Sequence, residues 1–309
     1  MSVEKVFNAM MGMQRFSWEQ GVAAQAALEW DREDWLRPLV RSAMYRSLPD
    51  GRLAQLNRQG ESPTDACCIG ESLVYLAQKD PYYKEALEHL VHWALEGAPR
   101  SEQGVVYHLS RAPEFWIDSV YMLPPFLAAA GYVQEALKQL WAYLDALYDP
   151  VAGLCRHIWH EEEQYYRDGS YWGVGNGWAL AGIARVIDFL PESYDRKKLE
   201  RFNEKLLRNV LKYMTEDGMF HNTLDDPSSF KEVNLSQMVA YTIYRGVKSG
   251  WLEEEYLETA EKLRSAAASQ VDEDGFVQNV CGMPTFREVG VAPEAQAFYV
   301  LMEAARRKL

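Results

Sequence analysis

The sequence F-W-I-D-S-V-Y-M-L-P-P-F-L-A-A-A-G-Y, from Phe115 to Tyr132, is an almost unbroken apolar and aromatic run that contains one carboxylate, Asp118. Read as a helix, the run is apolar on all sides, which predicts a buried helix. A buried carboxylate is costly to ionise without a partner, so the pKa of Asp118 should rise and allow general acid chemistry near neutral pH. The alternative is a structural Asp118, either a helix N-cap or an acid with satisfied hydrogen bonds.

A short glycine-led segment, here called a glycine tag, recurs five times between helical stretches. The copies are G-R-L-A-Q-L from Gly51, G-V-V-Y-H-L from Gly104, G-L-C-R-H-I from Gly153, G-M-F-H-N-T from Gly218 and G-F-V-Q-N-V from Gly275. Glycine suits the turn that would enter each tag.

Between the glycine tags, apolar residues recur at helical spacing, as in G-W-A-L-A-G-I-A-R-V-I-D-F-L from Gly177. A repeat of near fifty residues that holds two helices and a loop indicates helical hairpins, and about six fit in the chain. Six hairpins can close into an (α/α)6 barrel, which we predict as a single domain over residues 1–309. Small-residue-rich helices should be the inner ones, and helices rich in Lys and Glu the outer ones. An open helical solenoid is the alternative.

Composition narrows the possible partners. A net charge of −13 disfavours a nucleic-acid partner, which needs a basic face. The first residues lack the pattern of a signal peptide, and no run has the length needed to span a membrane. The four cysteines form neither a disulfide framework nor a zinc spacing. We therefore expect a soluble cytoplasmic protein with reduced thiols, no metal and no cofactor.

Further candidate residues lie around the glycine tags. Asp65 precedes an apolar helix and is either an N-cap or a second acid that works with Asp118. In S-Y-W-G-V-G-N-G-W, two tryptophans, Trp172 and Trp178, flank a glycine-rich turn and could stack on a sugar ring, or could simply belong to the core. His108, His157 and His221 recur near equivalent points of the tags.

In their order and spacing, several motifs resemble glycoside hydrolase family 105, the unsaturated rhamnogalacturonyl hydrolases, and the related unsaturated glucuronyl hydrolases of family 88. They are S-W-E-Q-G-V at Ser17, T-D-A-C-C-I-G at Thr64, W-I-D-S-V-Y-M-L-P-P-F-L at Trp116, G-L-C-R-H-I-W at Gly153, W-G-V-G-N-G-W at Trp172 and P-E-A-Q-A-F at Pro293. The resemblance implies an (α/α)6 barrel. It also implies removal of a 4,5-unsaturated uronic acid from the non-reducing end of lyase-generated oligosaccharides, by hydration of the vinyl ether.

By this resemblance, Asp118 matches the family's acid/base and Asp65 its second aspartate. The implied substrate contacts include His157 and Trp172. Trp18, Trp116, Asn176 and Trp178 are further predicted contacts within the matching motifs. Tyr107, His108 and Arg111, at the glycine tag ahead of the catalytic helix, are predicted contacts as well.

One departure concerns the residue two positions before Asn176, where well-known rhamnogalacturonyl members have an arginine. Here it is Val174, which cannot replace the bidentate contacts of a guanidinium. Either another cation serves, with Arg111 as the candidate, or the substrate differs. Two other functions remain open: a six-hairpin epimerase with a histidine pair as acid and base, and a non-catalytic helical-repeat binding protein.

Overall fold

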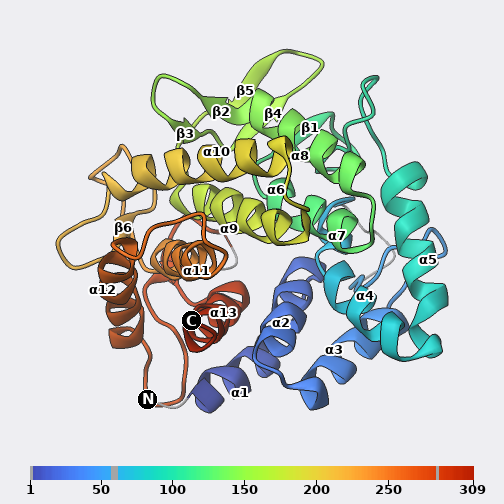
Figure 1. Ribbon diagram of the computed structural model, residues 1–309, viewed down its shortest axis with the longest axis horizontal. Helices are drawn as coiled ribbons and strands as arrows, with labels where there is room; N and C mark the ends of the chain where they lie inside the picture. The colour runs from blue at the N-terminus through green and yellow to red at the C-terminus, as the bar shows by residue number, and fades with distance from the viewer. Residues whose placement is uncertain (1–2, 57–61, 283–284) are drawn as a thin grey trace. The chain divides into compact units, whose positions relative to one another are not determined.

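The computed structural model describes residues 3–56, 62–282 and 285–309, most of which are helical (Figure 1). The α-helices are α1 Val3–Met13, α2 Ser17–Glu29, α3 Glu33–Tyr45, α4 Gly70–Lys79, α5 Lys84–His92, α6 Ser119–Met122, α7 Pro124–Ala129, α8 Val133–Leu147, α9 Gly173–Phe189, α10 Tyr194–Leu211, α11 Asn234–Lys248, α12 Tyr256–Ser269 and α13 Pro293–Arg307. Two short 3₁₀ helices are η1 Asp65–Cys67 and η2 Pro81–Tyr83, and η3 Trp93–Gly97 is a short π-helix.

The strands are short and lie in the connections between helices. They are β1 Glu114–Trp116, β2 Tyr148–Asp149, β3 Leu154–Cys155, β4 Ile158–His160, β5 Tyr165–Asp168, β6 Phe220–His221, β7 Lys231–Glu232, β8 Val280–Cys281 and β9 Val289–Gly290. The expected all-α class is confirmed for the described residues.

The chain divides into two compact units. Unit 1 comprises Met1–Gln14, Asp149–Cys155 and Ser170–Leu309, and unit 2 comprises Arg15–Tyr148 and Arg156–Gly169. Helices α2 to α8 therefore belong to unit 2, and α1 with α9 to α13 belong to unit 1.

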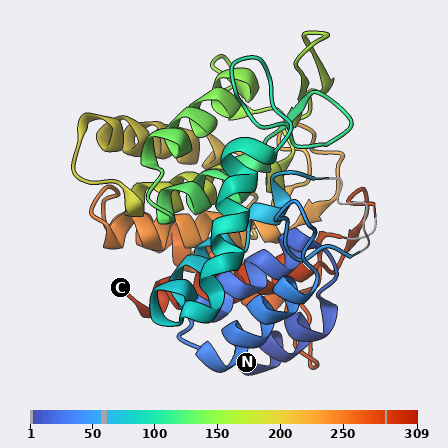
Figure 2. The same cartoon turned by 90° about the vertical axis from the view of Figure 1, so that its right-hand side faces the viewer.

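Each unit contains three packed pairs of helices. In unit 2, α2 packs on α3, α4 on α5 and α7 on α8 (Figures 1 and 2; α5 is the teal helix in Figure 2). In unit 1, α9 packs on α10, α11 on α12, and the last helix α13 on the first helix α1. The expected helical hairpins are thus present in the described part of the chain, with the two ends of the chain supplying the sixth pair.

The two members of a pair differ in burial. All residues of α9 from Gly173 to Ile187 are buried, whereas its partner α10 buries one face, formed by Leu199, Asn203, Leu206, Leu207 and Val210. This spacing is the stripe expected of an amphipathic helix. Likewise α4 buries seven of its ten residues, whereas its partner α5 buries Leu90 alone. Small-residue-rich inner helices and charged outer helices are confirmed. No described helix combines the length and apolar character needed to cross a membrane.

The glycine tags all begin with the same turn. Their five glycines have φ between 72° and 97°, which is easy only for a residue without a side chain. Four of them donate the backbone N–H to the carbonyl three residues earlier, and Gly153 donates to the carbonyl of Asp149. The turn predicted from the repeated glycines is confirmed.

The prediction of one buried helix over residues 115–132 is wrong in its secondary structure and right in its burial. Phe115 and Trp116 belong to β1, and the helix that follows is broken into α6 and α7. The break falls at Pro124, which has no N–H to continue the α6 ladder and begins α7 at a position where proline is tolerated. The segment between Ile117 and Ala128 is nonetheless largely buried.

Strand β1 belongs to a three-stranded antiparallel sheet with the order β1-β4-β5, all within unit 2. Trp116 pairs with Ile158, and Ile158 pairs with Asp168. The register shifts between Ile158 and Trp159. Asp118 lies two residues after β1, and His157 directly precedes β4. Both belong to the candidate active site.

Candidate active site

Asp118 lies at the start of α6 without acting as a side-chain cap. Its backbone carbonyl accepts from the N–H of Tyr121, at 2.9 Å, but its carboxylate makes no capping hydrogen bond. The side chain is 15% exposed, and no hydrogen-bond donor in the described chain reaches its buried Oδ2. Burial raises the pKa of Asp118, while the nearby His157 acts in the opposite direction. The expected rise is confirmed, and the N-cap alternative is not supported.

Asp65 begins the short turn η1, which packs on α2 and α6. Its side chain is buried, and its backbone N–H donates to Ser62 Oγ over 3.2 Å. Burial, and then the charge of Asp118, raise the pKa of Asp65 to about 7. Two carboxyl groups that cannot easily ionise together favour one protonated member, the arrangement that general acid chemistry needs.

His157 lies between two carboxylates. Its Nε2 is 3.7 Å from Asp118 Oδ2, and its Nδ1 is 2.9 Å from Oδ2 of Asp168, the last residue of β5. The backbone carbonyl of His157 accepts from the N–H of Ile117 over 3.0 Å, so the residue before Asp118 is tied directly to His157.

A second histidine, His108, links the chain around both aspartates. His108 Nδ1 lies 3.0 Å from Thr64 Oγ1 and 3.1 Å from Ser119 Oγ. Thr64 precedes Asp65, and Ser119 follows Asp118. Burial, assisted by the charge of His157, lowers the pKa of His108 to about 3, so the ring is neutral at physiological pH.

Trp116 packs against both histidines. Its ring stacks on His108 at 4.5 Å and meets His157 edge-on at 5.4 Å. The indole Nε1 donates to Oε2 of the buried Glu114 over 2.8 Å, and Arg167 donates to the other oxygen of Glu114 over 2.6 Å. The indole is therefore held in one orientation by a buried carboxylate.

The other predicted substrate contacts in unit 2 differ in their exposure and in the side chains they contact. Tyr107 donates its hydroxyl to Glu161 over 3.1 Å. Burial, with this bond to a carboxylate, raises the pKa of Tyr107 to about 12. Trp18 is half-buried and stacks on Phe16 with centroids 4.6 Å apart. Arg111 is exposed.

The remaining predicted contacts lie in unit 1. The side-chain amide of Asn176 pairs with the backbone of Cys155, accepting from its N–H over 2.8 Å and donating to its carbonyl over 3.0 Å. Trp178 is buried against Phe298, and Val174 is buried in the same helix, α9. Trp172 is half-buried, and its Nε1 donates to Asn222 Oδ1 over 3.2 Å. Asn176 thus fastens a glycine tag to α9, a role that its motif did not reveal.

Four polar residues of the site were not predicted: Thr64, Glu114, Ser119 and Asp168. Thr64 and Ser119 were present in the quoted motifs as direct neighbours of the aspartates, a signal that could have drawn attention to them. Glu114 and Asp168 become visible only once the three strands pair.

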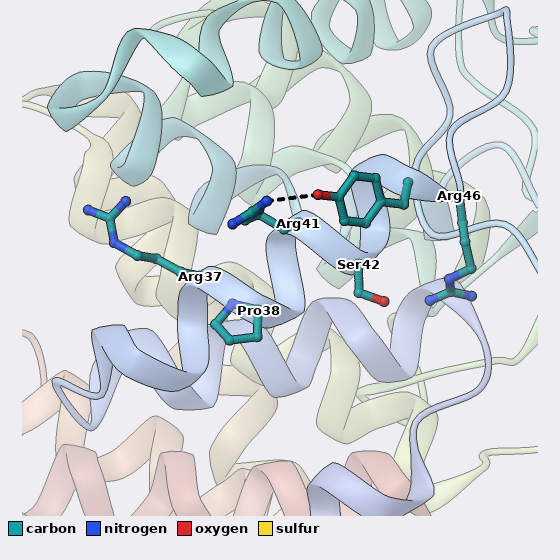
Figure 3. Close-up of a pocket in the computed structure, with 6 residues that line it drawn as sticks. Arg37, Pro38, Arg41, Ser42 and Arg46 are labelled. Atoms are coloured by element: carbon teal, nitrogen blue, oxygen red, sulfur yellow. Dashed lines mark hydrogen bonds between the residues drawn. The ribbon is translucent and has the colours of Figure 1, made fainter.

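A shallow pocket in unit 2 lies away from these residues, along α3 (Figure 3). It is lined by Arg37, Pro38, Arg41, Ser42, Tyr45 and Arg46. Arg41 donates to the Tyr45 hydroxyl over 2.8 Å, as the dashed line in Figure 3 shows. Its lining has no carboxylate, so the acid chemistry belongs to the Asp65 and Asp118 site.

The chain is similar to known proteins over most of its length. The unsaturated rhamnogalacturonyl hydrolase YesR of Bacillus subtilis (strain 168) is 28% identical over 285 residues, which cover 86% of this chain and 79% of YesR. An unsaturated 3S-rhamnoglycuronyl hydrolase of Formosa agariphila is 27% identical over 192 residues, which cover 55% of this chain and 51% of that protein.

Among solved structures, a possible member of the GH105 family from Salmonella enterica serovar Paratyphi A superposes with a TM-score of 0.86. It is 20% identical in sequence, and the match covers 98% of this chain and 92% of that one. The predicted fold class, an all-α (α/α)6 barrel of helical hairpins, is confirmed by this likeness. The model of Glycosyl Hydrolase Family 88 matches residues 2–305. A match over nearly the whole sequence shows that this chain belongs to Glycosyl Hydrolase Family 88.

Proposed function

We propose that this glycosidase removes a 4,5-unsaturated uronic acid from the non-reducing end of oligosaccharides produced by polysaccharide lyases. The observation that carries the proposal is the pair Asp118 and Asp65, two buried carboxyl groups whose pKa values are both raised, beside a neutral His108. The names of the related hydrolases, which specify unsaturated rhamnogalacturonyl and 3S-rhamnoglycuronyl activities, support the same substrate class.

In the proposed reaction Asp118 is the general acid and then the general base. Protonated Asp118 gives its proton to carbon 4 of the double bond, and positive charge develops at carbon 5 and the ring oxygen. Water adds at carbon 5 and returns a proton to the Asp118 carboxylate. The hemiketal that forms then opens and releases the second sugar as an alcohol. This cycle needs an acid that is protonated before the reaction, and burial of Asp118 provides it.

Asp65 assists through its electrostatic interaction with Asp118. Because the charge of Asp118 helps to raise the pKa of Asp65, proton loss from one group opposes proton loss from the other. Trp116, fixed by Glu114, offers an aromatic face next to both histidines, and sugar rings stack on such faces.

The identity of the uronic acid and of the second sugar follows less directly. Val174, which is buried in α9, has an uncharged side chain and cannot take the place of the family arginine. Arg111 is exposed and remains the proposed cationic anchor for the substrate carboxylate.

The six-hairpin epimerase is the second candidate. It would use a histidine pair as acid and base, but the Nδ1 of His108 is engaged by Thr64 and Ser119. The pKa of His108, lowered to about 3, leaves it poorly suited to donate a proton at neutral pH.

The test follows the ultraviolet absorbance of the conjugated double bond during incubation with a panel of lyase-generated disaccharides. The panel includes unsaturated galacturonyl and glucuronyl residues linked to different second sugars. We expect absorbance to fall with the wild type and to stay constant with Asp118→Asn, because the amide cannot donate the required proton.

Asp145→Asn is the matched control, because Asp145 is exposed on α8 of the same unit. It should retain full activity. Activity that survives in a well-folded Asp118→Asn variant would exclude Asp118 as the acid. A wild type inactive on every unsaturated substrate would exclude the proposed substrate class.

A cytoplasmic location belongs to the same proposal. The four cysteines are buried, and Cys67 and Cys155 form no disulfide in the described part of the chain, as is typical of a reducing compartment. Cell fractionation with an antibody against the chain tests this location, and recovery outside the cytoplasmic fraction would exclude it.

A further inference from the structure

The β1-β4-β5 sheet presents one face to helix α8 and the other face away from it. Phe115 of β1 contacts Tyr143 of α8, with ring centroids 5.8 Å apart, and Tyr166 of β5 donates its hydroxyl to a backbone carbonyl of the same helix over 3.2 Å. Successive side chains of a strand point to opposite faces. Glu114 and Trp116, on either side of Phe115, therefore lie on the face directed away from α8.

The pairing of the strands places further side chains on this second face. Glu114 is opposite His160, and His160 is opposite Tyr165, and side chains of directly opposite residues share a face. Arg167 is left without a paired residue in β4, because the register shifts at this point. A bulge of this kind re-aims a side chain, and the hydrogen bond from Arg167 to Glu114 shows that it reaches the same face. We call Glu114, Trp116, His160, Tyr165 and Arg167 the outer sheet face.

The outer sheet face leads from the buried acid to the protein surface, all within unit 2. At its inner end, Trp116 meets His157 edge-on at 5.4 Å, and His157 lies 3.7 Å from Asp118. At its outer end, the ring of Tyr165 stacks on His160 with centroids 5.5 Å apart and is 44% exposed. The face thus has an aromatic ring next to the site and a second one at the surface.

Arg167 supplies hydrogen-bond donors beside these two rings. It lies two residues after Tyr165, and its Nη1 donates over 2.6 Å to Glu114, which also accepts from the indole of Trp116. The Glu114 side chain is 2% exposed, whereas that of Arg167 is 52% exposed. A guanidinium has five N–H donors in one plane. The buried carboxylate therefore orients Arg167 while much of the guanidinium stays open to a ligand.

The proposed substrate fixes which sugars can reach this face. Its unsaturated uronic acid is the non-reducing end, so no sugar precedes it, and the rest of the oligosaccharide leaves the Asp118 site toward the reducing end. Aromatic rings offer an apolar face for a sugar to stack on, and guanidinium N–H groups donate to hydroxyl oxygens. We propose that the outer sheet face is a subsite for the sugars on the reducing side of the cleaved bond, with Tyr165 as the stacking ring and Arg167 as the donor to sugar hydroxyls. The subsite rests on the proposed function.

The experiment compares substrates that differ only on the reducing side. One is the methyl glycoside of the unsaturated uronic acid, which has no second sugar, and the others are an unsaturated disaccharide and an unsaturated tetrasaccharide. Tyr165→Ala should lower kcat/KM about threefold to tenfold for an oligosaccharide and leave the value for the methyl glycoside unchanged. The shortest oligosaccharide that shows the loss identifies which sugar stacks on Tyr165. An equal loss on the methyl glycoside, or no loss on either oligosaccharide, would overturn the proposal.

Arg167→Gln tests the second half of the subsite. This variant also removes a partner of the buried Glu114, and a structural loss of that kind would lower the rates on all substrates by the same factor. The readout is therefore the ratio of kcat/KM between oligosaccharide and methyl glycoside, which should fall about tenfold. An unchanged ratio would exclude Arg167 from the subsite. If Arg167→Gln does not fold, Tyr165→Ala still decides the proposal.

Two matched controls come from α3, where the exposed Tyr45 also lies beside an arginine, Arg41 (Figure 3). Tyr45→Ala and Arg41→Gln remove the same groups from a surface that is not continuous with the Asp118 site. Both variants should keep the wild-type ratio between oligosaccharide and methyl glycoside. A fall as large as that of Tyr165→Ala would assign the effect to a general loss of surface tyrosine or charge and overturn the proposal.

Binding measurements separate a failure of the subsite from a failure of the proposed function. Calorimetric titration of Asp118→Asn, which is expected to bind substrate without turnover, repeats the comparison where no rate can be measured. The disaccharide or the tetrasaccharide should bind more tightly than the methyl glycoside, and adding Tyr165→Ala should remove the difference. A wild type that consumes no unsaturated substrate ends the proposed function. An active wild type whose variants keep its preference for the oligosaccharides ends the subsite alone, and so does an Asp118→Asn protein that binds none of the three compounds.

Discussion

Thr64 Oγ1 lies 3.3 Å from Ser119 Oγ, and both hydroxyls lie within 3.1 Å of His108 Nδ1. The contact joins residues that are 55 positions apart in sequence, each directly beside an aspartate of the site. The three side chains are buried, and these contacts give each of them a hydrogen-bond partner. This cluster fixes the distance between the turn that carries Asp65 and the turn that carries Asp118.

Replacement of Thr64 by Val should therefore lower kcat about tenfold and destabilise the fold by about 1–2 kcal/mol, because a buried hydrogen-bonding partner is lost. The double variant with Ser119→Ala should cost less than the sum of the single variants, because both remove one shared cluster. Steady-state kinetics and urea unfolding measure the two effects.

Ser72→Ala provides the control for this prediction. Ser72 is fully buried in α4, and among the described residues its hydroxyl has no hydrogen-bond partner. The loss of this hydroxyl should leave kcat unchanged and stability equal or slightly higher. If Thr64→Val behaves like Ser72→Ala, the cluster does not position the aspartates.

The turn of the glycine tags can be tested at Gly275. Its φ is 95°, and a Cβ added there would lie 2.5 Å from the backbone of Lys5 in α1. Gly275→Ala should therefore destabilise the fold by more than the roughly 1 kcal/mol that positive φ alone costs an alanine. Thermal unfolding followed by circular dichroism measures the difference.

Gly250 distinguishes the cost of positive φ from the cost of a steric contact. It has φ of 74° in the same unit, and a Cβ added at this position would meet no atom of the described chain within 4 Å. Gly250→Ala should carry the conformational cost only, so equal losses at the two positions would show that the contact with Lys5 relaxes freely.

Features set by local chemistry could be predicted from the sequence. The repeated glycines indicated the turn of the tags, and helical periodicity indicated the paired helices, because both depend on neighbouring residues. The buried state of Asp118 followed from the apolar run around it. The break at Pro124 was also readable, since proline cannot continue a helix.

Features set by long-range pairing could not be predicted. Strands β1, β4 and β5 have at most four residues each, too few for an alternating pattern to stand out. Their pairing brings Asp168 to His157 and Arg167 to Glu114. Buried Trp178 illustrates the opposite difficulty, because an aromatic residue beside a glycine-rich loop has the same sequence signal in a core as in a binding site.

The indole of Trp116 should contribute more to substrate binding than to the chemical step. Trp116→Phe keeps an aromatic face but removes the Nε1 donor from the buried Glu114. We expect KM to rise several-fold with kcat nearly unchanged, and stability to fall by about 1–3 kcal/mol because Glu114 Oε2 loses its partner. Trp159→Phe, a half-buried position on β4 of the same sheet, is the control and should alter neither kinetic constant.

Asp65 should limit the stability of the protein at alkaline pH. Its pKa is raised from 3.8 to about 7 in the folded protein, so the folded state binds this proton more tightly than the unfolded state does. The resulting stabilisation is complete below pH 3.8 and is lost as pH rises to about 7. A shift of this size corresponds to a loss of roughly 2–4 kcal/mol.

Asp65→Asn imitates the protonated form and should remove this dependence. The variant should match the wild type in free energy of unfolding at pH 4 and exceed it by about 2–4 kcal/mol at pH 8, while losing most of its activity. Urea unfolding at the two pH values measures the difference, with Asp145→Asn expected to follow the wild type at both. If Asp65→Asn gains nothing at pH 8, Asp65 is ionised in the folded protein without cost, and its pKa is not raised beside Asp118.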